Sequence, residues 1–284
     1  MSRNYKIYEV KVFKEKECVS VSCQTDIDLK QLDDMIKVIL NIITITVFVK
    51  QRQLRRRSTY LIIHLAMVDL LVGAVSGPMQ IHLGMVWCYG ELESYDVTYF
   101  RIRLAIAPFF SFASLVNLTF ISLERTHATY RPFNHRFIRK WVYGLIIAFI
   151  YLSTICKGAI EGLTDWLFRY IWVFSSYFIL LVVICVCYIS IYIKVHCSHH
   201  PQHHGAAGLR ERKLTRTLFF VTLASILSFL PVNIYSGISL DIVAVLKFPS
   251  HFQISITTLT LLLANSLVNP LIYVVRMPEF RAGI

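Results

Sequence analysis

Long apolar runs separated by short polar segments dominate the sequence. They cover residues 35–49, 59–86, 99–123, 141–160, 168–193, 214–240 and 250–275. A helix needs about 20 predominantly apolar residues to cross the hydrocarbon core of a bilayer, and each run except the first approaches or exceeds that length. The strands of a transmembrane barrel would be about ten residues long and alternating. The pattern therefore predicts an all-α membrane protein with seven spanning helices, each satisfying its own backbone hydrogen bonds.

The first run is shorter than the others. Residues 35–49 would make roughly 22 Å of helix against a hydrocarbon core of about 30 Å. Acidic and basic residues come directly before it: Asp26, Asp28, Lys30, Asp33 and Asp34. Two explanations stand open at this point. Either a polar turn at the interface extends the helix, or residues 1–34 are not the native start of this helix.

Composition supports a membrane protein and excludes several other classes. The 284 residues are 56% hydrophobic and 16% charged, against about 45–50% and about 25% in soluble domains. The mean hydropathy is +0.57. With 11 Gly, 8 Pro and 7 Cys, the chain is neither collagen-like nor a small disulfide scaffold. No Walker loop, GxSxG or HExxH motif occurs, so we expect no enzymatic activity.

The basic residues predict the orientation of the chain. The net charge is +12, but the 29 Lys and Arg do not form one stripe, so we expect no nucleic-acid partner. Seventeen of them lie in the loops on one side of the predicted membrane and after residue 275, and five lie in the opposite loops. The positive-inside rule places the basic side in the cytoplasm. We therefore expect an extracellular segment 1–34, a membrane domain 35–275 and a short cytoplasmic tail 276–284.

One carboxylate stands inside an apolar run. Asp69 lies in LIIHLAMVDLLVG, and an unpaired charge there would cost several kcal/mol. It needs polar partners from other helices, and the candidates are Asn41, Ser114, Asn265, Ser266 and Asn269. Their oxygens suit either a hard cation such as sodium or a hydrogen-bond network without an ion. The sequence predicts no other metal site, because the His-rich stretch HCSHHPQHH lies in a loop that has no scaffold.

Several motifs stand together in one order along residues 38–284. They are Asn41, LAMVD ending at Asp69, SLERT with Glu124 and Arg125, SFLP ending at Pro231, and NPLIY with Asn269, Pro270 and Tyr273, followed by Phe280 in a short amphipathic tail. In this the chain resembles the rhodopsin-like G protein-coupled receptors. The resemblance implies a seven-helix bundle in the plasma membrane, a short C-terminal amphipathic helix, an extracellular ligand and a heterotrimeric G protein as the intracellular partner.

The residues also suggest how such a receptor would switch. Arg125 ends an apolar helix, and Glu211 lies near the inner end of the sixth span, so an ion pair between them would hold the two helix ends together. Pro231 kinks the sixth span, which turns a small rotation into a larger displacement at its cytoplasmic end. The resemblance places Arg125 and Tyr273 beneath the G protein. Tyr188 of the fifth span matches the family pattern as well.

Other positions depart from the family pattern. Phe100 stands where the family usually has the cysteine of a disulfide, and Cys88 and Cys156 are the remaining cysteines near the outer face. Thr126 follows Arg125 in place of Tyr, while Tyr151 replaces the Trp of the fourth helix. A receptor-like protein that does not signal therefore remains an alternative. A transporter is less well supported, because the chain shows neither repeated halves nor paired broken helices.

Two replaced residues restrict the class of ligand. Ala107 stands where amine receptors carry an Asp, and Leu263 stands where opsins carry the retinal Lys. The resemblance thus implies no retinal and no other cofactor beyond a sodium ion as modulator. The outer halves of the third, sixth and seventh spans would form a mostly apolar cavity for a small molecule or peptide. Its candidate lining residues are Ala107, Ser111, Phe229, Asn233, Ser236 and Leu259.

Overall fold

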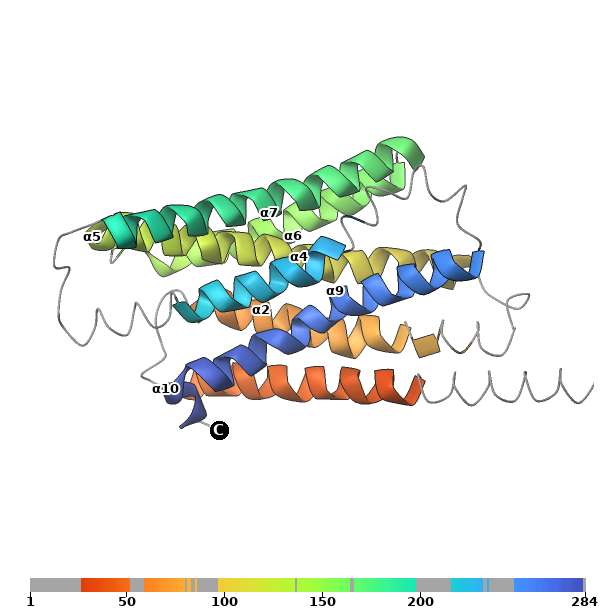
Figure 1. The fold of residues 1–284 in the computed structure, drawn as a ribbon, viewed down its shortest axis with the longest axis horizontal. Helices are drawn as coiled ribbons and strands as arrows, with labels where there is room; N and C mark the ends of the chain where they lie inside the picture. Colours follow the sequence, from red (N-terminus) through yellow and green to blue (C-terminus); the bar gives the residue numbers. More distant parts are fainter. Residues whose placement is uncertain are drawn as a thin grey trace, which may run out of the picture.

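The computed structural model describes residues 27–51, 59–79, 81–82, 85, 97–135, 137–163, 166–197, 216–231, 234 and 248–282. Long helices lie side by side along one direction (Figure 1). They are the helix over 27–50, α2 (Thr59–Leu71) continuing through the π-helical turn η2 (Val72–Ser76), α4 (Val97–Tyr130), α6 (Lys140–Leu163), α7 (Trp166–Cys197), the helix over 216–231, and α9 (Phe248–Arg276). Two short helices, α5 (Pro132–His135) and α10 (Pro278–Arg281), complete the described part.

α4 is the central helix of the bundle. It contacts α2, α6 and α7, and α2 in turn contacts α9. The buried core runs along these contacts through residues such as Leu65, Leu115, Leu118 and Ile150. Helices that surround α4 can therefore transmit a change at one end of the bundle through packed side chains to the other end.

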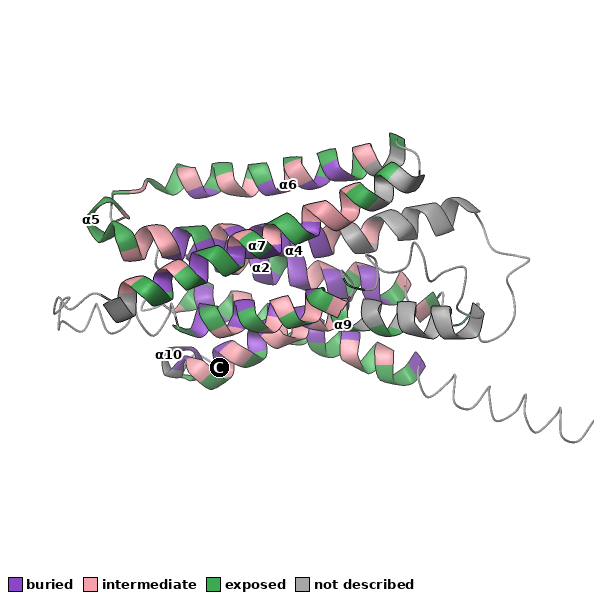
Figure 2. Ribbon diagram, turned by 45° about the horizontal axis from the view of Figure 1, so that its top comes forward, coloured by how far each residue is buried: buried purple, intermediate pink, exposed green. Residues whose placement is uncertain are grey.

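The outward faces of the bundle are apolar. α6 carries exposed Leu145, Phe149 and Leu152, and α7 carries exposed Ile179 and Val186. Figure 2 shows α6 at the margin of the bundle, with its exposed and buried residues on opposite sides. Large aliphatic and aromatic side chains facing outward on a helix of this length are expected where lipid, not water, is the surroundings.

Three described helices are long and apolar enough to cross a membrane: Thr59–Met79, Lys140–Ile160 and Ile171–Lys194. Arg216–Pro231 is a shorter apolar helix. Most helices run past the apolar segments that predict them, as α4 does by continuing to Tyr130. The extension is physically reasonable, because a helix can leave the hydrocarbon and continue with polar residues in the headgroup region.

The first helix shows the same effect at its start. The apolar run 35–49 is contained in a helix over 27–50, so the charged turns before residue 35 are helical too. Lys37 is 2% exposed and pairs with Asp33 at 2.5 Å and with Asp34 at 2.9 Å. A polar extension of the helix thus accounts for the short apolar run. The alternative, that residues 1–34 are not the native start of this helix, stays a prediction.

Two glycines bring this helix close to η2 and the turn that follows it. A Cβ at Gly73 would lie 3.1 Å from the Asp34 carbonyl oxygen, and a Cβ at Gly77 would overlap the Asp34 carboxylate. Gly73 and Gly77 are four residues apart on one face, the small-xxx-small spacing that lets membrane helices approach closely. This spacing is the sequence signal from which the close approach of the two helices could have been predicted.

α10 folds back onto the end of the bundle. Phe280 is fully buried, and its ring lies 5.5 Å from that of Phe48 and 6.1 Å from that of Tyr273. The start of the helix over 27–50 and the C-terminal α10 lie at opposite ends of the bundle (Figure 1).

Candidate functional site

Asp69 is the centre of a buried polar network. Its side chain is fully buried at the end of α2. The Asn269 amide of α9 donates a hydrogen bond to Asp69 Oδ2 at 2.6 Å, and the Ser114 hydroxyl of α4 donates to Oδ1 at 3.3 Å. Ser266 of α9 is also buried, at 3% exposure. One carboxylate thus joins α2, α4 and α9.

The first helix is connected to the same network through the backbone of α9. Asn41 is fully buried, and its amide donates to the Lys37 carbonyl at 2.9 Å and to the Ser266 carbonyl at 3.1 Å. Asn265 is also buried, at 2% exposure. The five candidate partners of Asp69 therefore lie in one buried region.

The donor set fits a hard monovalent cation. The side-chain oxygens of Asn265 and Asn269 are buried and have no hydrogen-bond partner in the described part of the chain. A carboxylate, a hydroxyl and amide oxygens are the ligand types that hard cations prefer. Asp69 is the acidic member of this set, and within the described residues no group of three or more His, Cys, Asp or Glu side chains gathers.

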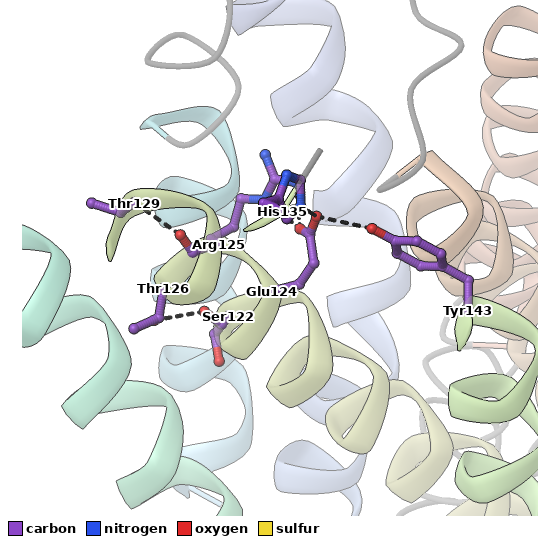
Figure 3. Close-up of polar contacts among 7 residues, drawn as sticks. All are labelled: Ser122, Glu124, Arg125, Thr126, Thr129, His135 and Tyr143. Carbon is purple, nitrogen blue, oxygen red and sulfur yellow. Dashed lines mark hydrogen bonds and ion pairs between the residues drawn. The ribbon is translucent and has the colours of Figure 1, made fainter. Parts of the chain in front are cut away.

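A second polar cluster surrounds Glu124 near the C-terminal end of α4 (Figure 3). Arg125 Nε donates to Glu124 Oε2 at 2.6 Å, and Arg125 Nη2 pairs with the same oxygen. His135 Nε2 of α5 lies 2.5 Å from Glu124 Oε1, and the Tyr143 hydroxyl of α6 donates to that oxygen at 3.4 Å. Glu124 and Arg125 are 8% and 2% exposed. The carboxylate therefore collects contacts from three elements.

Arg125 has an ion-pair partner on its own helix, and its pairing with Glu211 stays a prediction. The sequence suggested an ion pair with Glu211, which lies outside the described residues. The described partner is the adjacent Glu124, which holds the guanidinium on its own helix. Sequence reasoning missed His135 and Tyr143, because only the fold brings these residues to Glu124.

The remaining switch residues lie on α7, α9 and the helix over 216–231. The Tyr188 hydroxyl lies 3.0 Å from Thr222 Oγ1, which joins α7 to the helix over 216–231. That helix ends at Pro231 in the described residues. Pro270 lies inside α9, and Tyr273 is 1% exposed with its ring edge-on to Phe48.

A contact that the sequence did not predict joins α9 to the helix over 216–231. The Arg276 guanidinium carbon lies 3.8 Å from the centre of the Phe220 ring. A cation over an aromatic face is attracted by the ring quadrupole. This contact ties the end of α9 to the helix over 216–231, the element that the sequence predicts to move.

The predicted ligand cavity is described only in part. Ser111 and Phe229 are buried, at 4% and 1% exposure. Asn233 and Ser236 lie outside the described residues, and so do the side chains of Ala107 and Leu259. Phe229 belongs to a row of rings, since its centre lies 6.1 Å from that of Tyr177. Tyr177 lies 5.4 Å from Phe112 of α4.

Two departures from the family pattern have a structural counterpart. Tyr151, which replaces a Trp, places its ring edge-on to His64 of α2 at 5.2 Å. Cys156 is a free and exposed cysteine of α6, while Cys88 lies outside the described residues. The His-rich stretch is also outside them from residue 198 onward.

Comparison with known proteins identifies the family. The family model of the 7 transmembrane receptor (rhodopsin family) matches residues 40–169 and 154–273. The chain therefore belongs to the rhodopsin-like, or class A, G protein-coupled receptors, which are multi-pass membrane proteins. The predicted seven-helix bundle is confirmed with it.

Relatives and a solved structure agree with this membership. The substance-K receptor of Bos taurus is 25% identical over 88% of this chain and 71% of its own length. The histamine H2 receptor of Homo sapiens is 24% identical, covering 88% and 75%. Trace amine-associated receptor 7c of Rattus norvegicus is 27% identical, covering 86% and 76%. Squid rhodopsin has the same fold, with a TM-score of 0.77 at 18% identity, covering 93% of this chain and 85% of the squid protein.

Proposed function

We propose that this receptor binds an extracellular ligand and activates a heterotrimeric G protein through outward movement of the helix over 216–231. The buried Glu124–Arg125 pair carries the proposal. The pair keeps the Arg125 guanidinium buried below the inner surface of the bundle. Breaking the pair would make the guanidinium accessible to a partner. A buried, hydrogen-bonded charge pair has a defined closed arrangement, which a switch requires.

The movable element is held by contacts that can be exchanged. Tyr188 of α7 meets Thr222 through a hydroxyl pair, and Arg276 of α9 covers Phe220. These contacts hold the inner half of the helix over 216–231. Displacing this half about Pro231 would break them and open the space next to Arg125 and Tyr273. A ligand drives the change only as far as it binds the open arrangement more tightly than the closed one.

Asp69 would couple this movement to sodium. Asp69, Ser114 and Asn269 would hold the ion, with Asn265, Ser266 and Asn41 completing the polar surroundings. When bound, sodium neutralises the carboxylate and favours the arrangement in which α2, α4 and α9 converge on it. The receptor lies in the plasma membrane with its N-terminus outside and its C-terminus in the cytoplasm, as the distribution of basic residues supports.

Nucleotide exchange on a panel of purified G proteins tests the proposal. The full chain in nanodiscs is combined with each G protein and a library of amines, carboxylic acids, lipids and peptides. We expect exchange above the rate of the G protein alone for at least one pair, reduced at least about tenfold by Arg125→Ala, which is about 1.4 kcal/mol or more of coupling.

Arg139→Ala serves as the matched control, because Arg139 is exposed near the same membrane surface. It should retain most of the exchange activity. Correctly folded receptor that gives no exchange with any G protein and ligand would support the non-signalling alternative.

A further inference from the structure

Lys157 is a basic residue of the membrane region that belongs to neither polar cluster. It lies on α6 within the apolar span Lys140–Ile160, one turn before its end. A lysine at this depth could extend toward the interface and keep its ammonium in water. Instead it is 4% exposed, so its long side chain turns into the protein.

Aromatic rings from two other helices receive the ammonium. Lys157 Nζ lies 5.0 Å from the centre of the Phe112 ring on α4 and 5.3 Å from the centre of the Tyr177 ring on α7. A cation is attracted to the face of an aromatic ring, and more strongly where water is excluded. Placing a charge at membrane depth is costly, and ionisable residues found there commonly mark a binding site or pathway.

This charge lies next to the neighbours of two residues of the predicted ligand cavity. Phe112 follows directly after Ser111, and Tyr177 lies next to Phe229. Both Ser111 and Phe229 are candidate cavity residues. Lys157 therefore places a positive charge against the aromatic row that includes Phe229, from a helix outside the three spans that the sequence predicts to line the cavity.

We propose that Lys157 is the ion-pair partner of a carboxylate on the ligand, with the rings of Phe112, Tyr177 and Phe229 accommodating an apolar or aromatic body. The inference rests on the proposed function, since it assigns a ligand class to the same cavity. A charge-assisted hydrogen bond to a carboxylate is strong in water-excluded surroundings. Ala107 fits the same charge preference, because it removes the carboxylate that would attract an amine and repel an acid.

Matched ligand sets distinguish this charge preference from simple apolar binding. Phenyl, indolyl, naphthyl and octyl groups are each tested as the acetic acid, the acetamide and the ethylamine. Each compound is added to the purified full chain in nanodiscs, and the melting temperature is recorded without a G protein. We expect at least one acid to raise it by about 3 °C or more at saturation, and its amide and amine to raise it by less than a third of that.

Substitutions of Lys157 test whether this residue causes the preference for acids. Lys157→Met should abolish the acid-specific shift, and Lys157→Arg should retain at least half of it. Lys194→Met is the control, because Lys194 also lies over a ring, 5.8 Å from the centre of Tyr130, on the predicted cytoplasmic side. It should keep the full shift. If Lys157→Met fails to give monodisperse protein, Lys157→Gln and the acid–amide difference of the unaltered chain decide the question.

Three results would overturn the proposal: no acid shifts the melting temperature, acid and amide shift it equally, or Lys157→Met keeps the acid shift. The first two would indicate that Lys157 only cross-links the aromatic row. Nucleotide exchange on the same samples separates this failure from that of the proposed function. A shift without exchange would refute signalling and support the site, and exchange without a shift would refute the site alone.

Discussion

Among the described residues, Glu124 makes polar contacts with more side chains than Arg125 beside it does. Its two carboxylate oxygens meet Arg125, His135 and Tyr143, so one side chain fastens α4, α5 and α6 together. The motif SLERT pointed to Arg125 as the switch residue. In the structure, it is Glu124 that contacts side chains of three helices. Removing the charge of Glu124 should therefore release Arg125 more effectively than any other single change in this cluster.

Glu124→Gln is expected to raise ligand-independent nucleotide exchange several-fold, because the amide keeps the shape of the side chain and loses the ion pair. Breaking a buried pair also destabilises, by about 3–5 kcal/mol in the most buried cases, so a lower melting temperature should accompany the effect. Tyr143→Phe removes only the 3.4 Å hydrogen bond and should change exchange less. Unchanged basal exchange in well-folded Glu124→Gln would show that this pair does not restrain the switch.

Asp69 allows a test that needs no ligand. Replacing KCl with NaCl should raise the melting temperature of the unaltered chain, because sodium binds the folded arrangement of α2, α4 and α9. Asp69→Asn should remove this difference, and sodium sensitivity of ligand binding should fall with it. Ser228→Ala changes another hydroxyl, one bonded to its own helix at 3.0 Å, and should leave the sodium effect intact. Equal melting in both salts would favour the ion-free network.

At the scale of elements, close helix approach depends on two glycines. Gly77→Ala should destabilise the receptor by about 1–3 kcal/mol, because the added methyl group overlaps Asp34, whose carboxylate is engaged by Lys37. Gly158 of α6 has open space around its Cβ direction. Gly158→Ala should therefore stabilise by about 0.5–1 kcal/mol through helix propensity alone. Thermal melting in nanodiscs measures both, and equal effects would contradict the assigned contact.

The sequence predicted elements better than contacts. Apolar runs located the helices, because membrane length and hydropathy depend on local composition. They placed the start of the first helix at residue 35, whereas the described helix already includes the charged residues 27–34, of which Asp33 and Asp34 neutralise Lys37. Asp69 hydrogen-bonds Ser114 and Asn269, two of the five candidate partners that the sequence offers, because few polar groups are available at that depth. His135, Tyr143 and Arg276 gave no such signal, because their roles depend on which helices become neighbours.

For the whole molecule, the two polar clusters occupy different levels of one packed bundle. The Asp69 network joins α2, α4 and α9, and the Glu124 cluster joins α4, α5 and α6. α4 belongs to both and contacts α7, which carries Tyr177 and Tyr188. α4 carries both Phe112 of the aromatic row and Glu124, so a ligand bound at the row would be linked to the Glu124 cluster through this one helix. Coupling of this kind requires two discrete arrangements of the bundle.

Movement of the helix over 216–231 is the central claim, and a distance measurement tests it most directly. Spin labels are attached at Lys140 and Arg216, which are exposed at the predicted cytoplasmic ends of α6 and of the helix over 216–231, after replacement of the native cysteines. Pulsed electron paramagnetic resonance then gives the label separation with and without a nucleotide-free G protein. The proposed movement predicts a separation longer by several ångström in the complex, and no such change for Arg125→Ala. An identical distance distribution in the free receptor and in the isolated complex would contradict it.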